Sequence, residues 1–393
     1  MARVFAAIRR SVASQPSLAR VSLVGGSQYF ETLVVKITFV LPMYLAVPSG
    51  GFKVVYEYAN RLQARGHQIT VVHPRNETPQ RGAAQFLKSR LWPYKLRLQH
   101  RPLIPWFTVH PQVQLKLTPD LRAQFIPEAD AIIATAQGTA FPVAEYDARK
   151  GRKFYLLQSY EIWQAPEKTV RASWQLPMTK IAVSGWLQTI AQELGEAQRT
   201  VHIPLGLDFQ QFRITTPIAD RTRPRVGMLA HPHTNKGLAD GLKALQIAKE
   251  HFPTLEAVLF GASPRPAIAP DWIAYVQQPA AQELTALYNG CSIFLSPSWL
   301  EGWGLPAAEA MACGCALVST DNGGVHDFAQ AEQTAWLTPI QRPDLLGEAL
   351  QRLLADDGLR CRLATAGNKQ IQQFTWERAI IALERALEGV LAN

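Results

Sequence analysis

Short apolar runs rich in β-branched residues alternate with longer helix-forming segments along most of this chain. The first run, Lys36–Pro42, is followed by a turn with Gly50 and Gly51, a helix expected over 52–65 and a second apolar run at 68–73. A strand, a glycine-containing loop, a helix and another strand form a βαβ unit, from which doubly wound parallel sheets are built. Further strands of this first series are expected at 131–135, 153–157 and 180–184.

A second series of the same kind follows residues 214–224, a charged, proline-containing segment that is the best candidate for a linker. Strands are expected at 225–229, 255–260, 273–276, 291–297, 316–319 and 335–337, and helices at 238–251, 281–288, 343–355, 358–373 and 376–390. The pattern therefore predicts an α/β chain with two Rossmann-like lobes and a cleft between them. We place the N-terminal lobe at 36–208, the C-terminal lobe at 209–375 and a final helix at 376–393. Residues 1–35 are an N-terminal extension, for which disorder is one interpretation.

The stretch Trp299–Cys315 contains the strongest candidate site. It follows the strand expected at 291–297 and has a glycine-rich turn, then Pro306 and a run of helix formers. A strand that ends in a tight turn at a helix start presents free N–H groups and a partial positive charge, which suit a phosphate. Glu301 in the turn and Glu309 one helical turn further on would repel a diphosphate aimed at them, and are better placed to bind hydroxyl groups on either side. The stretch therefore predicts a nucleotide-sugar site.

The amino-acid composition agrees with two globular domains and adds an expectation about the cellular compartment. The chain has 393 residues, of which 47% are hydrophobic and 18% are charged. Its four cysteines form no disulfide framework and no zinc or redox spacing, so we expect a reduced, cytoplasmic protein. No run of eighteen apolar residues is present, so no membrane-spanning helix is expected.

The net charge of +9 is unevenly distributed. Residues 1–30 carry four arginines and no acid, and residues 78–119 carry seven basic residues with interleaved aromatic residues and no acid. Because the segment of about 80–119 is rich in proline and interrupts the strand–helix alternation, we interpret it as a basic insertion. Such a segment can lie on an anionic membrane surface, for example the inner face of the membrane, or it can be merely solvated. Nucleic acid is not the partner that we expect.

Several motifs, in this order, resemble those of the retaining glycosyltransferases of sequence family 4, which have the two-lobed GT-B fold. They are Gly50-Gly51 with Arg65–Val72, Ile203–Asp208 with Phe212, Asn235–Gly237, Glu283–Tyr288, Pro297-Ser298 and Glu301–Gly314. The resemblance covers about residues 36–75 and 180–385 and includes the two carboxylates separated by seven residues. It implies that the final helix returns to the N-terminal lobe, which would be the acceptor side.

The resemblance also implies roles for individual residues. Glu309 would bind the ribose hydroxyls and Glu301 a hydroxyl of the donated sugar. Lys236 would neutralise the departing diphosphate, where charge develops in the transition state, so Lys236 and Glu301 are the catalytic candidates. The full set of candidate donor-binding residues is Gly50, Gly51, His231, Lys236, Val276, Glu301, Gly302, Trp303, Gly304, Leu305 and Glu309, with the Gly304 and Leu305 amides at the diphosphate. On the acceptor side the candidates are Tyr160 and Glu161, which follow a predicted strand.

One segment departs from the family pattern. The family usually has an arginine shortly before the lysine, as a second cation for the diphosphate, whereas residues 229–233 of this chain read Leu-Ala-His-Pro-His. His231 or His233 would be a partial substitute, because a neutral imidazole is a poor replacement for a guanidinium group.

The function implied is that of a retaining, metal-independent hexosyltransferase. It would move a hexose from a nucleoside diphosphate sugar to a hydroxyl of a saccharide or lipid-linked acceptor, in cell-surface polysaccharide or glycolipid assembly. No cofactor beyond the donor is expected. Two alternatives stay open: a catalytically weak or inactive module that only binds a sugar nucleotide, and a nucleotide-sugar epimerase. A dinucleotide dehydrogenase fits less well, because no Gly-x-Gly-x-x-Gly follows the first strand.

Overall fold

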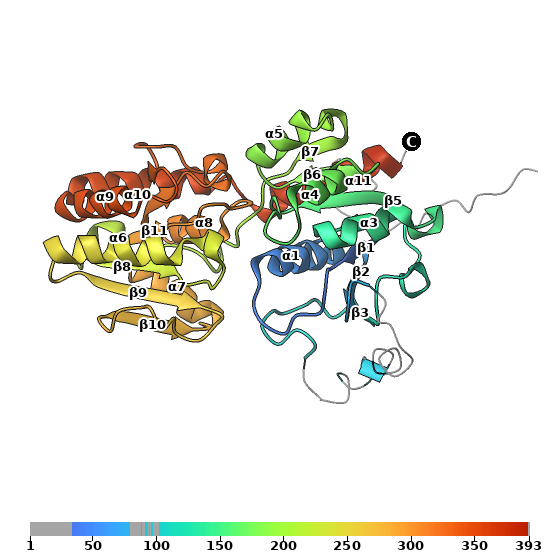
Figure 1. Ribbon diagram of the computed structural model, residues 1–393, viewed down its shortest axis with the longest axis horizontal. Coiled ribbons are helices and arrows are strands. Elements are labelled where there is room, and N and C mark those ends of the chain that lie inside the picture. The colour runs from blue at the N-terminus through green and yellow to red at the C-terminus, as the bar shows by residue number, and fades with distance from the viewer. Residues whose placement is uncertain are drawn as a thin grey trace, which may run out of the picture.

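The computed structural model describes residues 34–78 and 102–391, together with residues 88, 91, 92, 94 and 96. These residues form two lobes side by side, each built on a parallel sheet with helices packed against it (Figure 1). The predicted α/β architecture with two Rossmann-like lobes is confirmed. The predicted N-terminal extension, apart from residues 34 and 35, lies outside the described residues.

The N-terminal lobe has a seven-stranded sheet in the order β3-β2-β1-β4-β5-β6-β7, with parallel pairing throughout. Its strands are β1 (Lys36–Val40), β2 (Gln68–Pro74), β3 (Gln114–Thr118), β4 (Ala131–Ala134), β5 (Arg152–Leu157), β6 (Thr179–Ala182) and β7 (Thr200–His202). Its helices are α1 (Gly50–Ala64), α3 (Gln137–Glu145), α4 (Glu167–Trp174) and α5 (Gly185–Glu193). The central strands read as nearly continuous apolar runs because both faces of a parallel sheet are covered.

The predicted basic insertion is shorter than the sequence indicated. Residues Gln114–Thr118, which were included in it, form β3 and pair with β2 at the edge of the sheet. Leu115 and Leu117 alternate there with Gln114 and Lys116, a pattern typical of an edge strand with one buried face. Most of residues 80–101 lie outside the described residues, so the expected membrane contact of this segment stays a prediction.

The C-terminal lobe has a six-stranded sheet in the order β10-β9-β8-β11-β12-β13, again with parallel pairing. Its strands are β8 (Arg225–Leu229), β9 (Glu256–Gly261), β10 (Ile273–Gln277), β11 (Ile293–Ser296), β12 (Ala316–Thr320) and β13 (Trp336–Thr338). Its helices are α6 (Leu238–His251), α7 (Ala281–Asn289), α8 (Leu305–Ala312), α9 (Pro343–Ala355) and α10 (Asp357–Ile371). Short 3₁₀ helices are η1 (Ala123–Phe125), η2 (Ala148–Lys150), η3 (Ala197–Arg199), η4 (Ile218–Asp220), η5 (Thr234–Lys236) and η6 (Gly324–Asp327).

The last helix, α11 (Trp376–Leu391), crosses back to the N-terminal lobe, as expected (Figure 1). Its first residue packs edge-on against Tyr58 of α1, with ring centroids 5.2 Å apart. Its buried Glu384 accepts hydrogen bonds from Arg65 Nε at 2.7 Å and Arg65 Nη2 at 2.8 Å, and lies 3.0 Å from His67 Nε2. Over the described residues, the chain therefore crosses between the lobes twice.

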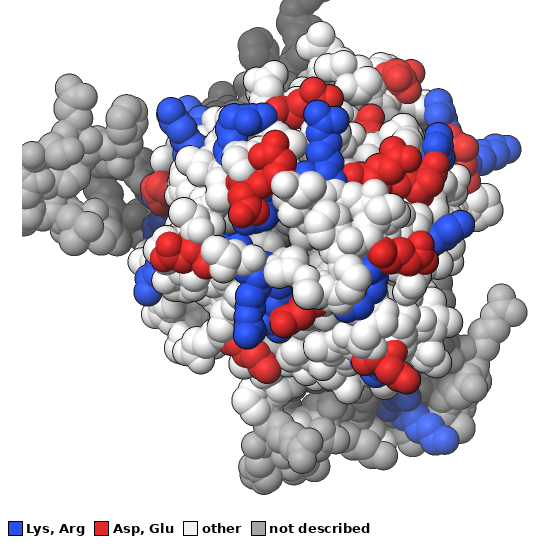
Figure 2. Space-filling model, turned by 90° about the vertical axis from the view of Figure 1, so that its left-hand side faces the viewer, with Lys and Arg blue, Asp and Glu red and all other residues white. Residues whose placement is uncertain are grey.

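The end of the C-terminal lobe opposite the N-terminal lobe carries basic and acidic side chains side by side, without a broad area of one sign (Figure 2). Across the part of the chain that the structure describes, none of the helices has the length and apolar character needed to cross a lipid bilayer.

Candidate donor site between the two lobes

In both sheets the strand order reverses at one position, and the loops at that position face the other lobe. In the C-terminal lobe the reversal lies between β8 and β11, which are neighbours in the sheet. In the N-terminal lobe it lies between β1 and β4, and the loop after β1 contains Gly50 at the start of α1. Crevices at such reversals are where open α/β sheets bind ligands.

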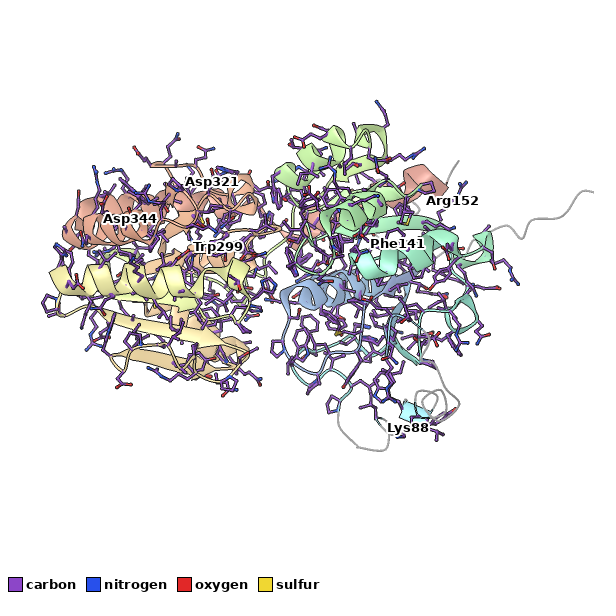
Figure 3. All side chains as sticks on the ribbon, viewed as in Figure 1. Lys88, Phe141, Arg152, Trp299, Asp321 and Asp344 are labelled. Carbon is purple, nitrogen blue, oxygen red and sulfur yellow. The ribbon has the colours of Figure 1, made fainter. Side chains whose placement is uncertain are left out.

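The loop after β11 turns sharply into α8. Gly304 has φ 108°, a left-handed conformation that favours glycine, and it precedes α8, whose second residue is Pro306. No acidic side chain lies in the first turn of α8, so its amide groups and partial positive charge are not neutralised there. Trp299, in the same loop, lies nearer to the boundary between the lobes than Asp344 of α9 does (Figure 3).

Lys236 and Glu301, from different loops, form a bidentate ion pair in this crevice. Lys236 Nζ lies 2.8 Å from each carboxylate oxygen of Glu301, and the two side chains are 28% and 12% exposed. The loops are joined by a backbone hydrogen bond from Trp299 N to Asn235 O at 2.7 Å. The two predicted catalytic candidates are thus brought together, beside a pocket that Gly304 also lines.

Glu309 lies further along α8 and has partners from two other elements. Its carboxylate accepts hydrogen bonds from Lys53 Nζ at 2.7 Å and from Tyr288 Oη at 3.2 Å, and its side chain is only 7% exposed. Lys53 belongs to α1 of the N-terminal lobe, so this ion pair joins the two lobes. A second pocket is lined by Lys53, Leu305 and Glu309.

Sequence reasoning missed Lys53. A signal was present, because a cation in the first turn of a helix opposes the helix dipole. Lys53 lies two residues after Gly51, which was named as a candidate donor-binding residue together with Gly50. Its partner could not be found from the sequence, since Glu309 lies 256 positions away.

Gln158, after β5, links the start of α1 with the glycine-rich turn. A methyl group added to Gly302 would overlap the Gln158 carbonyl oxygen, and one added to Gly51 would lie 3.5 Å from the Gln158 side-chain amide. Trp186 Nε1 also donates a hydrogen bond to Gly302 O at 3.1 Å. Gln158 Oε1 is buried and has no hydrogen-bond partner among the described residues. The lobes are therefore closely apposed at this turn.

The segment that lacks the expected arginine is organised by histidines. His231 Nδ1 accepts a hydrogen bond from His233 N at 3.1 Å, and His233 packs edge-on against Trp163 of the N-terminal lobe, with ring centroids 5.6 Å apart. Partial desolvation and the nearby charge of Lys236 lower the pKa of His231. A neutral His231 supplies no second cation, and the described residues that line the two pockets include no arginine.

The acceptor-side candidates differ in their surroundings. Tyr160 is buried, and its hydroxyl donates to Glu167 Oε1 at 3.0 Å. Glu161 Oε2 accepts a hydrogen bond from Gln137 N, the first residue of α3, at 2.5 Å. Burial and the Glu77 carboxylate raise the pKa of Glu161 to about 7, although the bond from Gln137 N opposes the shift. A carboxyl group with a pKa near 7 can exchange a proton at physiological pH.

Two other donor-binding candidates have constrained side chains. The Trp303 side chain is buried and packs against Phe328 and Phe374, with ring centroids 5.0 Å and 5.6 Å apart. Only its backbone remains for a ligand contact. Val276 is partly buried on β10. Within the described part of the chain, no three or more His, Cys, Asp or Glu side chains are grouped so that they could hold a metal ion.

Comparison with known proteins shows what the C-terminal lobe is similar to. Residues 217–370 match the family model described as glycosyl transferases group 1. The match lies within the C-terminal lobe and covers less than half of the chain. Among curated relatives, D-inositol 3-phosphate glycosyltransferase of Salinispora arenicola is 31% identical over 113 residues, 29% of this chain and 25% of that protein. The same-named protein of Xylanimonas cellulosilytica is 31% identical over 205 residues, 46% of this chain and 49% of that protein.

The matches to these relatives thus span a quarter to a half of their lengths. Over the whole chain, solved structures are similar in fold. Sucrose-phosphate synthase from Thermosynechococcus elongatus superposes with a TM-score of 0.68 at 18% identity, covering 91% of this chain and 99% of that one. HepE from Anabaena, solved with UDP-glucose, also superposes with a TM-score of 0.68. It is 17% identical, and the match covers 91% of this chain and 100% of that one. The chain therefore has the GT-B fold, and the family 4 resemblance is consistent with these relatives.

Proposed function

We propose that the chain is a retaining glycosyltransferase, which moves a hexose from a nucleoside diphosphate sugar to an acceptor hydroxyl. The observation that carries the proposal is the convergence of Glu301, Lys236 and Glu309 at the start of α8, opposite the N-terminal lobe. In this proposal Glu309 accepts hydrogen bonds from the ribose, Glu301 accepts one from the donated sugar, and the Gly304 and Leu305 amides hold the diphosphate between them.

In the reaction the bond between the anomeric carbon and the diphosphate oxygen breaks, and the bond to the acceptor oxygen forms on the same face. The electron pair leaves with the diphosphate, and the departing phosphate oxygen takes the acceptor proton. Lys236 stabilises the charge that develops on the leaving group, for which one preorganised donor contributes on the order of 3 kcal/mol. Because the donor site lies in the C-terminal lobe, the acceptor would enter from the side of Glu161 and Tyr160.

The similar proteins support the class of reaction, which is glycosyl transfer. The substrates of this chain are proposals. HepE was solved with UDP-glucose, and several relatives are named as glycosyltransferases acting on a phosphorylated inositol. For this chain we propose a saccharide or lipid-linked acceptor used in cell-surface polysaccharide or glycolipid assembly, on the cytoplasmic side of the membrane.

The test starts with a thermal-shift screen against nucleotide sugars with different bases and hexoses. The donor that raises the melting temperature most is then used to follow release of nucleoside diphosphate with and without a panel of saccharide and lipid-linked acceptors. Lys236→Ala and Glu309→Ala are each expected to lower turnover by at least about 100-fold, with the melting temperature of the unliganded protein kept within a few degrees. Near wild-type turnover in either variant would show that the site is wrongly assigned.

One observation favours a binding module as the second candidate. Both carboxylates are paired with lysines, and the expected arginine is missing from residues 229–233. Calorimetric binding of a nucleotide sugar without turnover on any acceptor would support this function over transfer. Release of nucleoside diphosphate that depends on the acceptor would exclude an epimerase.

A further inference from the structure

We propose that Lys53 of α1 is the second cation of the donor site, held on Glu309 until the ribose of the nucleotide displaces it onto the diphosphate. The inference rests on the proposed function, since it concerns the same donor site. It assigns to the N-terminal lobe a direct part in holding the leaving group.

The charges of the unliganded site cancel in pairs. Lys236 is neutralised by Glu301 and Lys53 by Glu309, at N–O distances of 2.8 Å and 2.7 Å. A diphosphate needs unpaired positive charge, and neither lysine offers it while bound to its carboxylate. Sugar and ribose hydroxyls are neutral donors, so if they take over the carboxylates, both lysines lose their partners. In the exchange, hydroxyls replace lysines on the carboxylates and phosphate oxygens replace carboxylates on the lysines, so every charged group keeps a hydrogen-bond partner.

The position of Lys53 allows this exchange. Its ammonium group and the residues Leu305 and Glu309 line one pocket, and Leu305 is the first residue of α8, at whose start the diphosphate is proposed to lie. The lysine side chain has a flexible four-carbon stem and three donors, so it can change partner without a backbone movement. The ammonium group also lies 5.0 Å from the centroid of the Phe212 ring, which favours a cation in that pocket.

Lys53 keeps its charge in this environment. Burial disfavours the ammonium form, but Glu309, with smaller contributions from Glu57 and Asp208, more than offsets it and raises the pKa of Lys53. No acidic residue lies in the first turn of α1, and Ser49 makes no side-chain capping hydrogen bond. The start of α1 therefore adds its partial positive charge to that of Lys53, which further favours a phosphate at this position.

The experiment separates the diphosphate from the nucleoside. Isothermal titration calorimetry on the full chain first compares UDP, GDP and ADP, and the tightest of them is then compared with its own nucleoside. Lys53→Met is expected to weaken binding of the diphosphate at least tenfold, while the affinity for the nucleoside stays within about threefold or improves, because Glu309 has lost its competitor. Lys53→Arg keeps the positive charge and is expected to retain most of the preference for the diphosphate.

Lys243→Met serves as the matched control, since Lys243 is an exposed lysine of α6 and its loss changes the net charge equally. Unchanged or tighter binding of both ligands to Lys53→Met would overturn the inference, because Lys53 would then only compete for Glu309. An equal loss for both ligands would overturn it as well, since it would indicate a structural role. If the wild-type protein binds none of the three diphosphates, the proposed function itself fails. This result differs from every outcome for the variants, because it is obtained with the unsubstituted protein.

Discussion

Each carboxylate of the donor site has a lysine as its partner, and these partners come from different lobes. Lys236 lies seven residues after β8 and reaches Glu301 within the C-terminal lobe, whereas Lys53 reaches Glu309 from α1. Each pair supplies a counter-charge to a carboxylate that has little contact with solvent, and this matters because an unpaired buried charge is costly. At the level of single residues, the candidate site is therefore held by ion pairs, which a sugar nucleotide would replace if our proposal is correct.

Glu161 provides a prediction for how the unfolding free energy of the protein depends on pH. Burial raises its pKa in the folded protein from the usual value of 4.5 to about 7, so its contribution to stability is fully present below pH 4.5 and is lost as the pH rises through 7. The loss amounts to about 3 kcal/mol at most. Urea denaturation of the wild type and of Glu161→Gln across pH 4 to 8.5 measures it. The difference in unfolding free energy, wild type minus variant, should fall over this window; a difference that stays constant with pH would contradict the raised pKa.

At the level of elements, the turn between β11 and α8 does two things. It exposes the start of α8, and its Gly302 packs against the backbone of Gln158 from the other lobe. The position of Gly302 is therefore set by contact between the lobes, while the left-handed φ of Gly304 is set by the turn itself. Glycine is thus favoured at these two positions of one motif for different physical reasons.

Gly302→Ala is expected to push the lobes apart at this turn, because its methyl group would overlap the Gln158 carbonyl oxygen. Turnover should fall about 100-fold, as expected for a misplacement of about 1 Å between reacting groups, and nucleoside binding to the C-terminal lobe should change much less. Steady-state kinetics and calorimetry measure the two effects. Gly389→Ala in α11 is the control, since its methyl group would meet no heavy atom within 4 Å. Wild-type turnover in Gly302→Ala would show that this close contact is not needed for the reaction.

At the level of the whole molecule, α11 fastens the end of the chain to the lobe in which it began. The backbone at Trp376 lies directly against Gly206, where any side chain would overlap it, and Leu207 N donates to Phe374 O at 2.9 Å. Glu384 then joins α11 to Arg65 and His67 at the end of α1 and the start of β2. The two crossings limit how the lobes can move, so opening of the site is expected to occur by rotation about this double connection.

Glu384→Ala leaves the Arg65 guanidinium group and His67 without their buried acceptor. We expect the unfolding free energy to fall by about 2 kcal/mol, less than for a fully buried pair because the Arg65 side chain is 35% exposed. Urea denaturation monitored by tryptophan fluorescence measures the change. Glu377→Ala on the same helix removes a carboxylate that is 65% exposed, and should change the unfolding free energy by less than about 0.5 kcal/mol. Equal effects of the two variants would show that Glu384 does not fasten the helix.

The sequence alone determined the elements whose local patterns are strong. Apart from β3 and β7, the strands of both lobes follow from apolar periodicity, as does the helix α6, and the turn at Glu301–Gly304 follows from its glycines and Pro306, because these features act over a few residues. The edge strand β3 was assigned to an insertion, since it lies among basic residues and prolines and only its pairing with β2 identifies it. Lys236 and Glu301 were both assigned to the candidate site from the family resemblance, but their ion pair was not predicted.

Only the tertiary structure decided which residues meet across the two lobes. Lys53 with Glu309, Gln158 with Gly302 and Arg65 with Glu384 are each separated by more than a hundred positions. No local propensity encodes such contacts, because they depend on how two separately formed sheets pack and on where the last helix returns. Likewise, the pKa of Glu161 near 7 arises from burial and from Glu77, both consequences of packing. The candidate residues of the β11–α8 turn can thus be found in the sequence, whereas their partners from the other lobe are selected by the packing of the lobes.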